Sequence, residues 1–399
     1  MERSQRGLGE VEFILFMGLV AASTALAIDM LLPAFASMRP TFGLDAESTQ
    51  LSATISVFFA GMGLGNLVHG PLSDALGRKP VLYATTLLYG LAALAAALAP
   101  SLTILLVVRF VWGFASAGPR TMTQAIVRDR YSGDEMARIM ALVQTAFLLG
   151  PIAAPILGKL ILNVGSWRWV LAFGAIVAAG VALWSLRLEE TLPPTDRRPL
   201  RLGSTLAGFR LVVSNRVTLG YGLAVTFAFA AFFSYLASSE LIFESVYGRP
   251  NWFVPTFSAL SAVMAMAAIG AGRILRVVSA DRLNLLAGFG LVGSSALFLT
   301  VALVTDGRPP IGWFIVLIGL TMVSNVVLFP TSNSLALEPM GALAGTAAAV
   351  LGFLSSVLGA ALSQVINQAI DHTITPMAAG YVGYSIVALG FILFARSGR

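Results

Sequence analysis

Long apolar runs alternate with short polar turns along this chain. Twelve runs stand out, at approximately residues 11–32, 49–70, 80–99, 102–126, 137–161, 168–187, 217–239, 252–273, 283–304, 311–331, 342–365 and 375–395. An apolar run of about 18 residues or more is long enough to cross a bilayer as a helix. The pattern predicts an all-α polytopic membrane protein with twelve transmembrane helices.

A single long polar stretch, residues 188–216, divides these runs into two sets of six. Two equal sets of spans are typical of transporters built from two pseudo-symmetric repeats around a central cavity. We therefore expect an N-terminal six-helix bundle at 1–187, a cytoplasmic linker at 188–216 and a C-terminal six-helix bundle at 217–399.

Composition and charge distribution support this class and set the orientation of the chain. Hydrophobic residues make up 57% of the chain and charged residues only 11%, whereas soluble domains carry about 25% charged residues. With a cytoplasmic N-terminus, five of the 25 Lys and Arg residues lie at the outer side and two inside spans, which leaves 18 on the cytoplasmic side. This asymmetry predicts that both termini are cytoplasmic. The basic residues are those of membrane loops, so we expect a lipid bilayer and no nucleic acid as a partner.

The residues needed for several other functions are absent from the sequence. There is no cysteine, and the two histidines, His69 and His372, are far apart. We therefore expect no metal site, no cofactor and no enzymatic activity. A Gly-rich phosphate loop with Lys and Ser or Thr is also missing, which argues against an ATP-driven pump.

Residues 70–80, GPLSDALGRKP, form a short basic turn between two apolar runs. We expect five of its residues, Gly70, Asp74, Gly77, Arg78 and Lys79, in a loop between two membrane helices. Glycines permit tight turns, and basic residues hold a loop on the cytoplasmic side. The turn resembles the signature between the second and third helices of the major facilitator superfamily, where it acts as a conformational switch. Ala75 departs from that pattern, which has Arg or Lys at this position.

Several other segments resemble the bicyclomycin-resistance type of drug/proton antiporters within that superfamily. They are AIDMLLPAF at 27–35, GPIAAPILG at 150–158, WRWVLAFGAI at 167–176, EETLPP at 189–194, GYGLAVTFAFAAFFSYLASS at 220–239 and AGTAAAVLGFLSSVLGA at 344–360. The resemblance implies a monomer in the bacterial inner membrane that exports small amphipathic compounds in exchange for protons. The alternative is an exporter or facilitator of a sugar, amino acid or dipeptide on the same fold.

Asp29 is an ionisable residue in the outer third of the first apolar run. Such a group is expensive in hydrocarbon and usually faces a water-filled interior. The resemblance implies that Asp29 takes part in both proton coupling and substrate binding. A hydrated Asp at the outer surface is the alternative.

Arg109 belongs to a polar stripe along the fourth run. The stripe consists of Arg109, Gly113, Ser116, Arg120 and Gln124, spaced three or four residues apart. Side chains at this spacing lie on one helix face, and lipid does not tolerate such a face. The resemblance implies a role for Arg109 in proton transfer, whereas Arg120 is not part of the family pattern and is close enough to the cytoplasmic end to extend to the headgroups.

The fifth run contains Gly150, Pro151, Pro155 and Gly158. Proline bends a membrane helix, and glycine allows close contact with a neighbouring helix. In the resembled family, a Gly/Pro motif at this place marks antiport. Simple helix packing is the alternative.

Candidate substrate contacts gather near the outer end of the seventh run. Phe232, Tyr235 and Ser239 share a helix face, and Glu240 follows them. Aromatic walls with scattered hydroxyls suit amphipathic molecules. Gln144 of the fifth run is a further candidate for substrate contact. The alternatives are lipid-facing phenylalanines, a hydrated Glu240 and interhelical hydrogen bonding.

Overall fold

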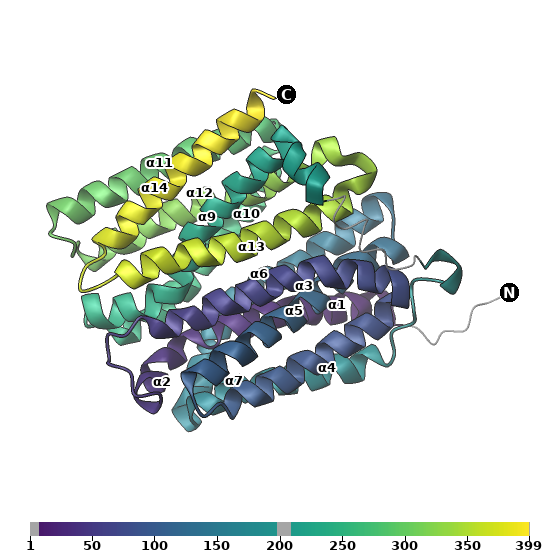
Figure 1. Cartoon of the computed structure of the whole chain (residues 1–399), viewed down its shortest axis with the longest axis horizontal. Coiled ribbons are helices and arrows are strands. Elements are labelled where there is room, and N and C mark those ends of the chain that lie inside the picture. The colour runs from purple at the N-terminus through teal and green to yellow at the C-terminus, as the bar shows by residue number, and fades with distance from the viewer. Residues whose placement is uncertain (1–7, 198–208, 399) are drawn as a thin grey trace. The chain divides into compact units, whose positions relative to one another are not determined.

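The computed structural model describes residues 8–197 and 209–398, and these residues form helices and turns with no β-strand (Figure 1). The helices are α1 (Glu10–Asp29), α2 (Phe35–Thr41), α3 (Ala53–Leu76), α4 (Arg78–Ala97), α5 (Leu102–Arg130), α6 (Gly133–Val164), α7 (Trp167–Ser185), α9 (Arg216–Leu241), α10 (Phe253–Ile274), α11 (Ala280–Val304), α12 (Ile311–Leu337), α13 (Ala344–Ala369) and α14 (Thr375–Arg396). Short 3-10 turns lie at Leu32–Ala34, Gln50–Ser52, Pro194–Asp196, Pro250–Trp252 and Glu338–Leu343, and a π-turn lies at Ile242–Val246.

Twelve helical segments in the described part of the chain are long and apolar enough to cross a membrane. The predictions of an all-α architecture and of twelve spans are therefore confirmed. Part of the predicted linker, residues 198–208, lies outside the described residues. The cytoplasmic position of that linker stays a prediction.

The chain forms two compact units. The first unit contains Met1–Met38 and Ala60–Arg201, and the second contains Arg39–Phe59 and Leu202–Arg399. Residues 39–59 run from the end of the first span into the start of the second, but they pack with the second unit. We call these residues the crossing segment.

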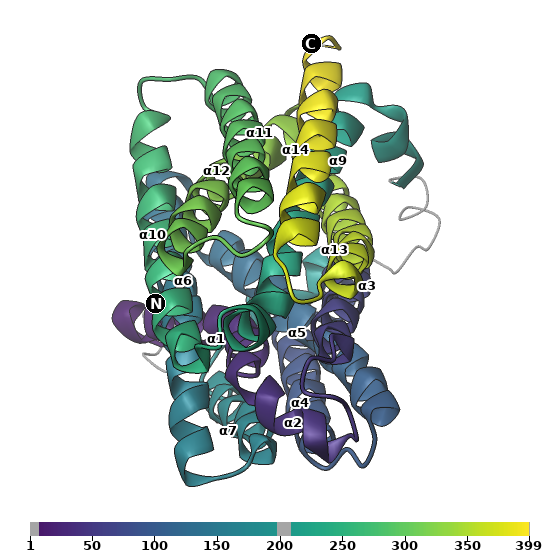
Figure 2. The same cartoon turned by 90° about the vertical axis from the view of Figure 1, so that its left-hand side faces the viewer.

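Small residues bring the helices of the first unit close together. α1 packs against α6, and α4 packs against α5 and α7 (Figure 2). An added Cβ at Gly90 of α4 would lie 2.9 Å from the Cβ of Ala178 on α7, and one at Gly61 of α3 would lie 2.0 Å from the carbonyl oxygen of Phe110 on α5. Contacts this close require glycine, and small residues are the usual way in which membrane helices approach.

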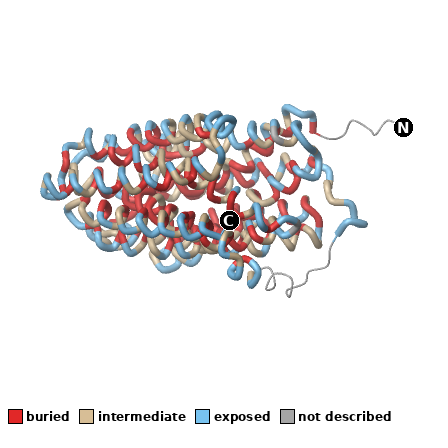
Figure 3. The backbone as a smooth tube through the Cα atoms, turned by 90° about the horizontal axis from the view of Figure 1, so that it is seen from above, coloured by how far each residue is buried: buried red, intermediate tan, exposed pale blue. Residues whose placement is uncertain are grey.

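α9 is the central helix of the second unit. It packs against α12, α13 and α14, and 72% of the most apolar part of its span is buried, against 28–44% for the five other spans of this unit. Buried and exposed residues alternate along the helices (Figure 3). Many exposed residues are large and apolar, such as Leu87, Leu91 and Leu94 on α4, which is the surface that a bilayer requires and that water does not favour.

Candidate functional site

α1 ends at Asp29 because of Pro33. A proline has no N–H group, and its ring clashes with the carbonyl four residues earlier, which here belongs to Asp29. The chain continues instead in the 3-10 turn Leu32–Ala34. The side chain of Asp29 is buried, with Asp29 only 5% exposed. Among residues 8–197 and 209–398, none of the ion pairs involves it.

Arg109 of α5 is bound to the same end of α1. Its Nη1 donates a hydrogen bond of 2.9 Å to the carbonyl oxygen of Ala27. The N–H of Leu31, which would continue the α-helix onto Ala27, donates to Ile28 instead at 3.3 Å. A cation that donates to a free carbonyl is favourable at a helix C-terminus. Arg109 therefore completes the end of α1, two residues from Asp29.

Aromatic residues of the first unit hold Arg109 in place. The guanidinium carbon of Arg109 lies 5.1 Å from the centre of the Trp112 ring. Trp112 meets the ring of Tyr89 edge-on at 5.3 Å, and the hydroxyl of Tyr89 donates to the carbonyl oxygen of Ser23 at 2.8 Å. α4 and α5 thus each supply a donor to the backbone of α1.

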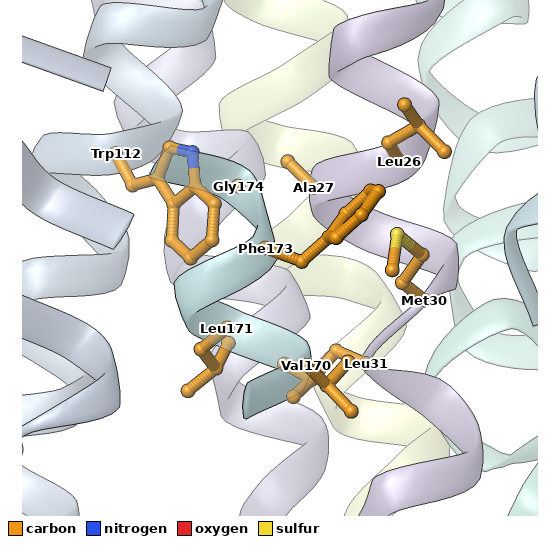
Figure 4. A pocket seen from close by; sticks show the side chains of 9 residues that line it. All are labelled: Leu26, Ala27, Met30, Leu31, Trp112, Val170, Leu171, Phe173 and Gly174. Carbon is orange, nitrogen blue, oxygen red and sulfur yellow. The ribbon is translucent and has the colours of Figure 1, made fainter. Parts of the chain in front are cut away.

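An apolar crevice lies beside this arrangement, between α1, α5 and α7 (Figure 4). Its lining residues are Leu26, Ala27, Met30, Leu31, Trp112, Val170, Leu171, Phe173 and Gly174. The crevice borders the part of α1 that carries Asp29, but Asp29 does not line it. Aliphatic and aromatic walls without a charge suit an apolar group.

The glycines of the fifth span pack against α1 on either side of Asp29. An added Cβ at Gly150 of α6 would lie 2.7 Å from the Cβ of Ala25, and one at Gly158 would lie 2.3 Å from the carbonyl oxygen of Met30. Pro151 and Pro155 lie between these two contacts, inside a helix that continues from Gly133 to Val164. The Gly/Pro stretch therefore positions α6 against the end of α1. Its part in antiport stays a prediction.

The structure corrects the predicted loop at residues 70–80. Gly70 and Asp74 lie within α3, and Arg78 and Lys79 form the first turn of α4. Only Gly77 separates the two helices. Gly70 lies in the body of α3 and is not among the glycines with positive φ, so this glycine makes no tight turn. The helices extend further than expected because the polar groups at the junction are satisfied by partners at the end of α3 and by others distant in sequence.

The side chain of Arg78 forms most of these contacts. Its Nη1 donates to Asp74 Oδ1 at 2.6 Å and to Ser73 Oγ at 2.7 Å, and its Nε donates to Asp129 Oδ2 at 2.9 Å. Arg78 is itself buried, with 5% exposure. Ion pairs with two carboxylates offset the cost of burying the guanidinium. The absence of a basic residue at Ala75 leaves this network complete.

Glu190 is a functional candidate that the sequence reasoning did not identify. Its carboxylate accepts from the backbone N–H of Arg78 at 2.9 Å and of Lys79 at 3.2 Å. A carboxylate at a helix N-terminus accepts hydrogen bonds from free N–H groups and interacts favourably with the positive end of the helix dipole. Lys79 Nζ also donates to the carbonyl oxygen of Leu186 at 3.1 Å. The segment after α7 is thus fastened to the start of α4. The acidic pair in EETLPP was visible in the sequence, but no local spacing connects it to residue 78.

Gly77 is required at this junction for two reasons. Its φ is +107°, and an added Cβ would lie 2.5 Å from Glu190 Oε2. We expect Gly77→Ala to destabilise the protein by about 1–2 kcal/mol from backbone strain, with a further loss from the displaced cap. Gly70→Ala is the matched control, since alanine in an open helical site is neutral or stabilising. Thermal unfolding in detergent measures both variants, and equal unfolding temperatures for the two would contradict the expectation.

In the second unit, α9 carries the predicted aromatic and hydroxyl residues. Tyr235 is buried and stacks on Phe257 at a centroid distance of 6.0 Å. Phe232 is partly buried and lies 6.0 Å from Phe233. Ser239 is buried, and its hydroxyl donates to the carbonyl oxygen of Leu236 at 3.3 Å. These three residues lie within two turns of one helix, and their contact with substrate stays a prediction.

Glu240 is held by a residue that sequence reasoning left unassigned. Arg39 of the crossing segment donates from Nη1 to Glu240 Oε1 at 3.1 Å and from Nη2 to Oε2 at 2.6 Å. The same Nη1 donates to Glu244 Oε2 at 2.8 Å. Both oxygens of Glu240 therefore have a cationic partner already. Arg39 and Glu240 are 201 positions apart, and no local pattern connects them.

The remaining predicted residues stand apart from these clusters. Gln144 is exposed on α6, and Arg120 is partly buried on α5. Asp29 and Gln144 belong to the first unit, whereas Phe232, Tyr235, Ser239 and Glu240 belong to the second. Within the described ranges, no group of three or more His, Cys, Asp or Glu residues is placed to hold a metal ion.

Comparisons with known proteins give the family. The chain matches the profile of the Major Facilitator Superfamily over residues 17–364. It is 28% identical over 371 residues to a bicyclomycin resistance protein homolog of Haemophilus influenzae, with coverage of 92% of this chain and 91% of that protein. It is 25% identical over 397 residues to multidrug resistance protein D of Escherichia coli, with coverage of 96% and 94%.

Among solved structures, a D-xylose–proton symporter superimposes with a TM-score of 0.76 at 14% identity, covering 96% of this chain and 97% of that one. This structural likeness shows the fold alone. The match to the family profile covers most of the chain, and the twelve spans agree with it. The chain belongs to the Major Facilitator Superfamily and is therefore a multi-pass membrane transporter and not an enzyme.

Proposed function

We propose that this transporter exports small amphipathic compounds, antibiotics among them, in exchange for protons. The observation that carries the proposal is Asp29, a buried acidic residue in a membrane span that forms no ion pair with the described residues. A carboxylate without a counter-ion is costly in this position, so a protein retains it for its chemistry and not for its stability. The names of the relatives, bicyclomycin resistance protein homolog and multidrug resistance protein D, support drugs as the substrates.

In the proposed cycle, Asp29 binds either a proton or a substrate. Protonation on the outer side lowers the affinity for substrate and permits release, and deprotonation toward the cytoplasm makes the site ready again. The proton can shift the conformational equilibrium only through its different affinity for the two states. Arg109 holds the end of α1, two residues before Asp29, through its hydrogen bond to the carbonyl oxygen of Ala27. The substrate is exposed to one side of the membrane at a time.

We also infer the bacterial inner membrane as the location, with both termini cytoplasmic and a monomer as the working unit. The orientation is supported by the excess of Lys and Arg in the loops assigned to the cytoplasm.

Proteoliposomes with an acidic lumen test the exchange. The purified protein is reconstituted, and a pH-sensitive dye in the lumen follows proton movement after addition of bicyclomycin, of the lipophilic cation tetraphenylphosphonium or of D-xylose. We expect one or both of the first two compounds to drive alkalinisation of the lumen above the rate in protein-free vesicles. D-xylose, the probe for a sugar transporter, should give no such change. Uptake of D-xylose alone, or drug uptake without proton movement, would contradict proton-driven drug export.

A further inference from the structure

We propose that Arg39, Glu240 and Glu244 form an acid-sensitive latch that holds the crossing segment in place on the second unit and releases it when the carboxylate of Glu240 takes up a proton. The latch deepens the proposed function, on which it rests for its role in transport, because it supplies a conformational step that external protons control. It is independent of Asp29, which belongs to the first unit.

The geometry of the latch is that of a strong buried ion pair. Arg39 lies in the last turn of α2. Its Nη1 and Nη2 donate hydrogen bonds to the two carboxylate oxygens of Glu240, at 3.1 and 2.6 Å. The side chains of Arg39 and Glu240 are only 2% and 7% exposed. Paired N–H donors on a carboxylate give both strength and a fixed direction. Arg39 also donates from Nε to the carbonyl oxygen of Ser48 at 3.4 Å, so the guanidinium fastens the loop that follows α2.

The charges in this cluster do not balance. One guanidinium faces two carboxylates, which leaves one negative charge when all three groups are ionised. Arg39 and Glu244 are the charged groups that act on Glu240 among the described residues. The side chain of Glu244 is 32% exposed, and this gives protons a path from water to the buried pair. A proton on Glu240 therefore removes the buried carboxylate that both Nη atoms of Arg39 contact, and it leaves Arg39 with only the partly exposed Glu244.

The other contacts of the crossing segment with the second unit are mostly uncharged. The hydroxyls of Ser52 and Ser56 both donate to Gln364 Oε1 on α13, each at 3.2 Å. Phe59 stacks on Phe233 of α9 at a centroid distance of 3.8 Å. Neutral contacts of this kind do not change with pH. The ionic contact is the part that acid weakens.

A second, exposed pair works in the opposite direction. Glu47 of the crossing segment lies 3.4 Å from Nδ1 of His372, and both side chains are more than half exposed. This contact is an ion pair only when the histidine carries a proton, and surface pairs contribute little. The buried pair dominates, because loss of one partner from a buried ion pair leaves the other charge uncompensated. Acidification should therefore release the segment.

The chain path gives this release a consequence for transport. The segment is entered from Met38 and left at Ala60, both of which belong to the first unit. The latch therefore fixes, at one point within the second unit, the piece of chain that leaves the first unit and returns to it. In the predicted orientation this point lies at the outer side, where the proton concentration is highest in a respiring bacterium. Protons from the outer side would then favour the state in which the crossing segment is released.

A labelling experiment tests the latch without measuring transport. The chain contains no cysteine, so single cysteines report on single sites. Ser52→Cys places a thiol on the buried side of the crossing segment, at a residue that is 4% exposed. Its rate of reaction with a water-soluble maleimide is divided by that of the exposed Ala46→Cys variant, which corrects for the pH dependence of the reagent. The measurement uses the full-length protein in detergent, at neutral and mildly acidic pH.

We expect the corrected rate at Ser52→Cys to rise at least about tenfold on acidification. A tenfold change in the equilibrium between the held and the released segment corresponds to about 1.4 kcal/mol, and loss of one partner from a buried ion pair costs more than this. Glu240→Gln imitates the protonated acid and should give the fast rate already at neutral pH. The exchanged pair Arg39→Glu with Glu240→Arg keeps the same three charges and should restore slow labelling. Asp281→Asn removes a different ion pair of the same unit, that with Arg396, and should leave the rate unchanged.

A buried cysteine away from the segment, Ser295→Cys, reports general loosening, since Ser295 is fully buried on α11. Rates that do not change with pH, or an equal rise at Ser295→Cys, would overturn the latch. If Glu240→Gln fails to fold, the pH series on Ser52→Cys in the otherwise unchanged chain decides the question alone. A protein that shows the latch but exchanges no proton for drug would contradict the proposed function and leave the latch standing.

Discussion

Asp29→Asn should slow drug-driven proton exchange by about a hundredfold or more, the scale on which loss of a proton-transfer group slows reactions that depend on it. Asparagine has nearly the same shape as aspartate but cannot carry a proton. The variant should nevertheless unfold at the same temperature as the native protein or at a higher one. An unpaired carboxyl that is only 5% exposed costs free energy to desolvate, and a neutral amide costs less. Loss of activity without loss of stability is what separates a proton carrier from a structural residue.

Two further variants make this result specific. Asp29→Glu keeps a carboxyl on the same helix face and should retain part of the exchange. Asp371→Asn removes an exposed acid of the second unit and should leave the exchange unchanged. Drug-driven proton movement in the Asp29→Asn protein at the native rate would place the coupling proton on another group.

Gly158→Leu should lower the unfolding temperature and abolish transport together. A Cβ at this position would lie 2.3 Å from the carbonyl oxygen of Met30, and backbone atoms of a membrane helix have little room to yield. Overpacking of this kind costs about 1–3 kcal/mol. The displaced residue follows Asp29 directly, so the strain falls on the carboxyl that the proposed mechanism uses. Thermal unfolding and drug-driven proton exchange are measured on the same preparation.

Gly180→Leu is the matched control on α7. Gly180 is exposed, and nothing lies within 4 Å of an added Cβ there. Replacement of glycine by leucine in an open helical position favours the helix by up to about 1 kcal/mol, so this variant should be as stable as the native protein and fully active. If Gly158→Leu behaved like Gly180→Leu, the close packing of α6 on α1 would have no part in the fold or in transport.

The predicted switch loop shows where sequence reasoning succeeds and where it fails. Asp74 and Arg78 were both singled out at the junction, and they form an ion pair across the break between α3 and α4 at Gly77. The loop around them was wrong, since both helices continue to Gly77. Helix ends depend on which partners satisfy the free N–H and C=O groups. Here the partner is Glu190, 112 positions from Arg78.

The sequence by itself determined the membrane architecture of this protein and the isolation of Asp29 in its first span. Both follow from the cost of placing polar groups in hydrocarbon, which depends on residues adjacent in the chain. Only the tertiary structure decided that Arg109 closes the end of α1, that α6 packs around Asp29 and that the crossing segment joins the second unit through Arg39 and Glu240. These contacts connect residues 82 and 201 positions apart. Such partners are selected by packing geometry, and a local pattern of hydrophobic and polar residues carries no information about it.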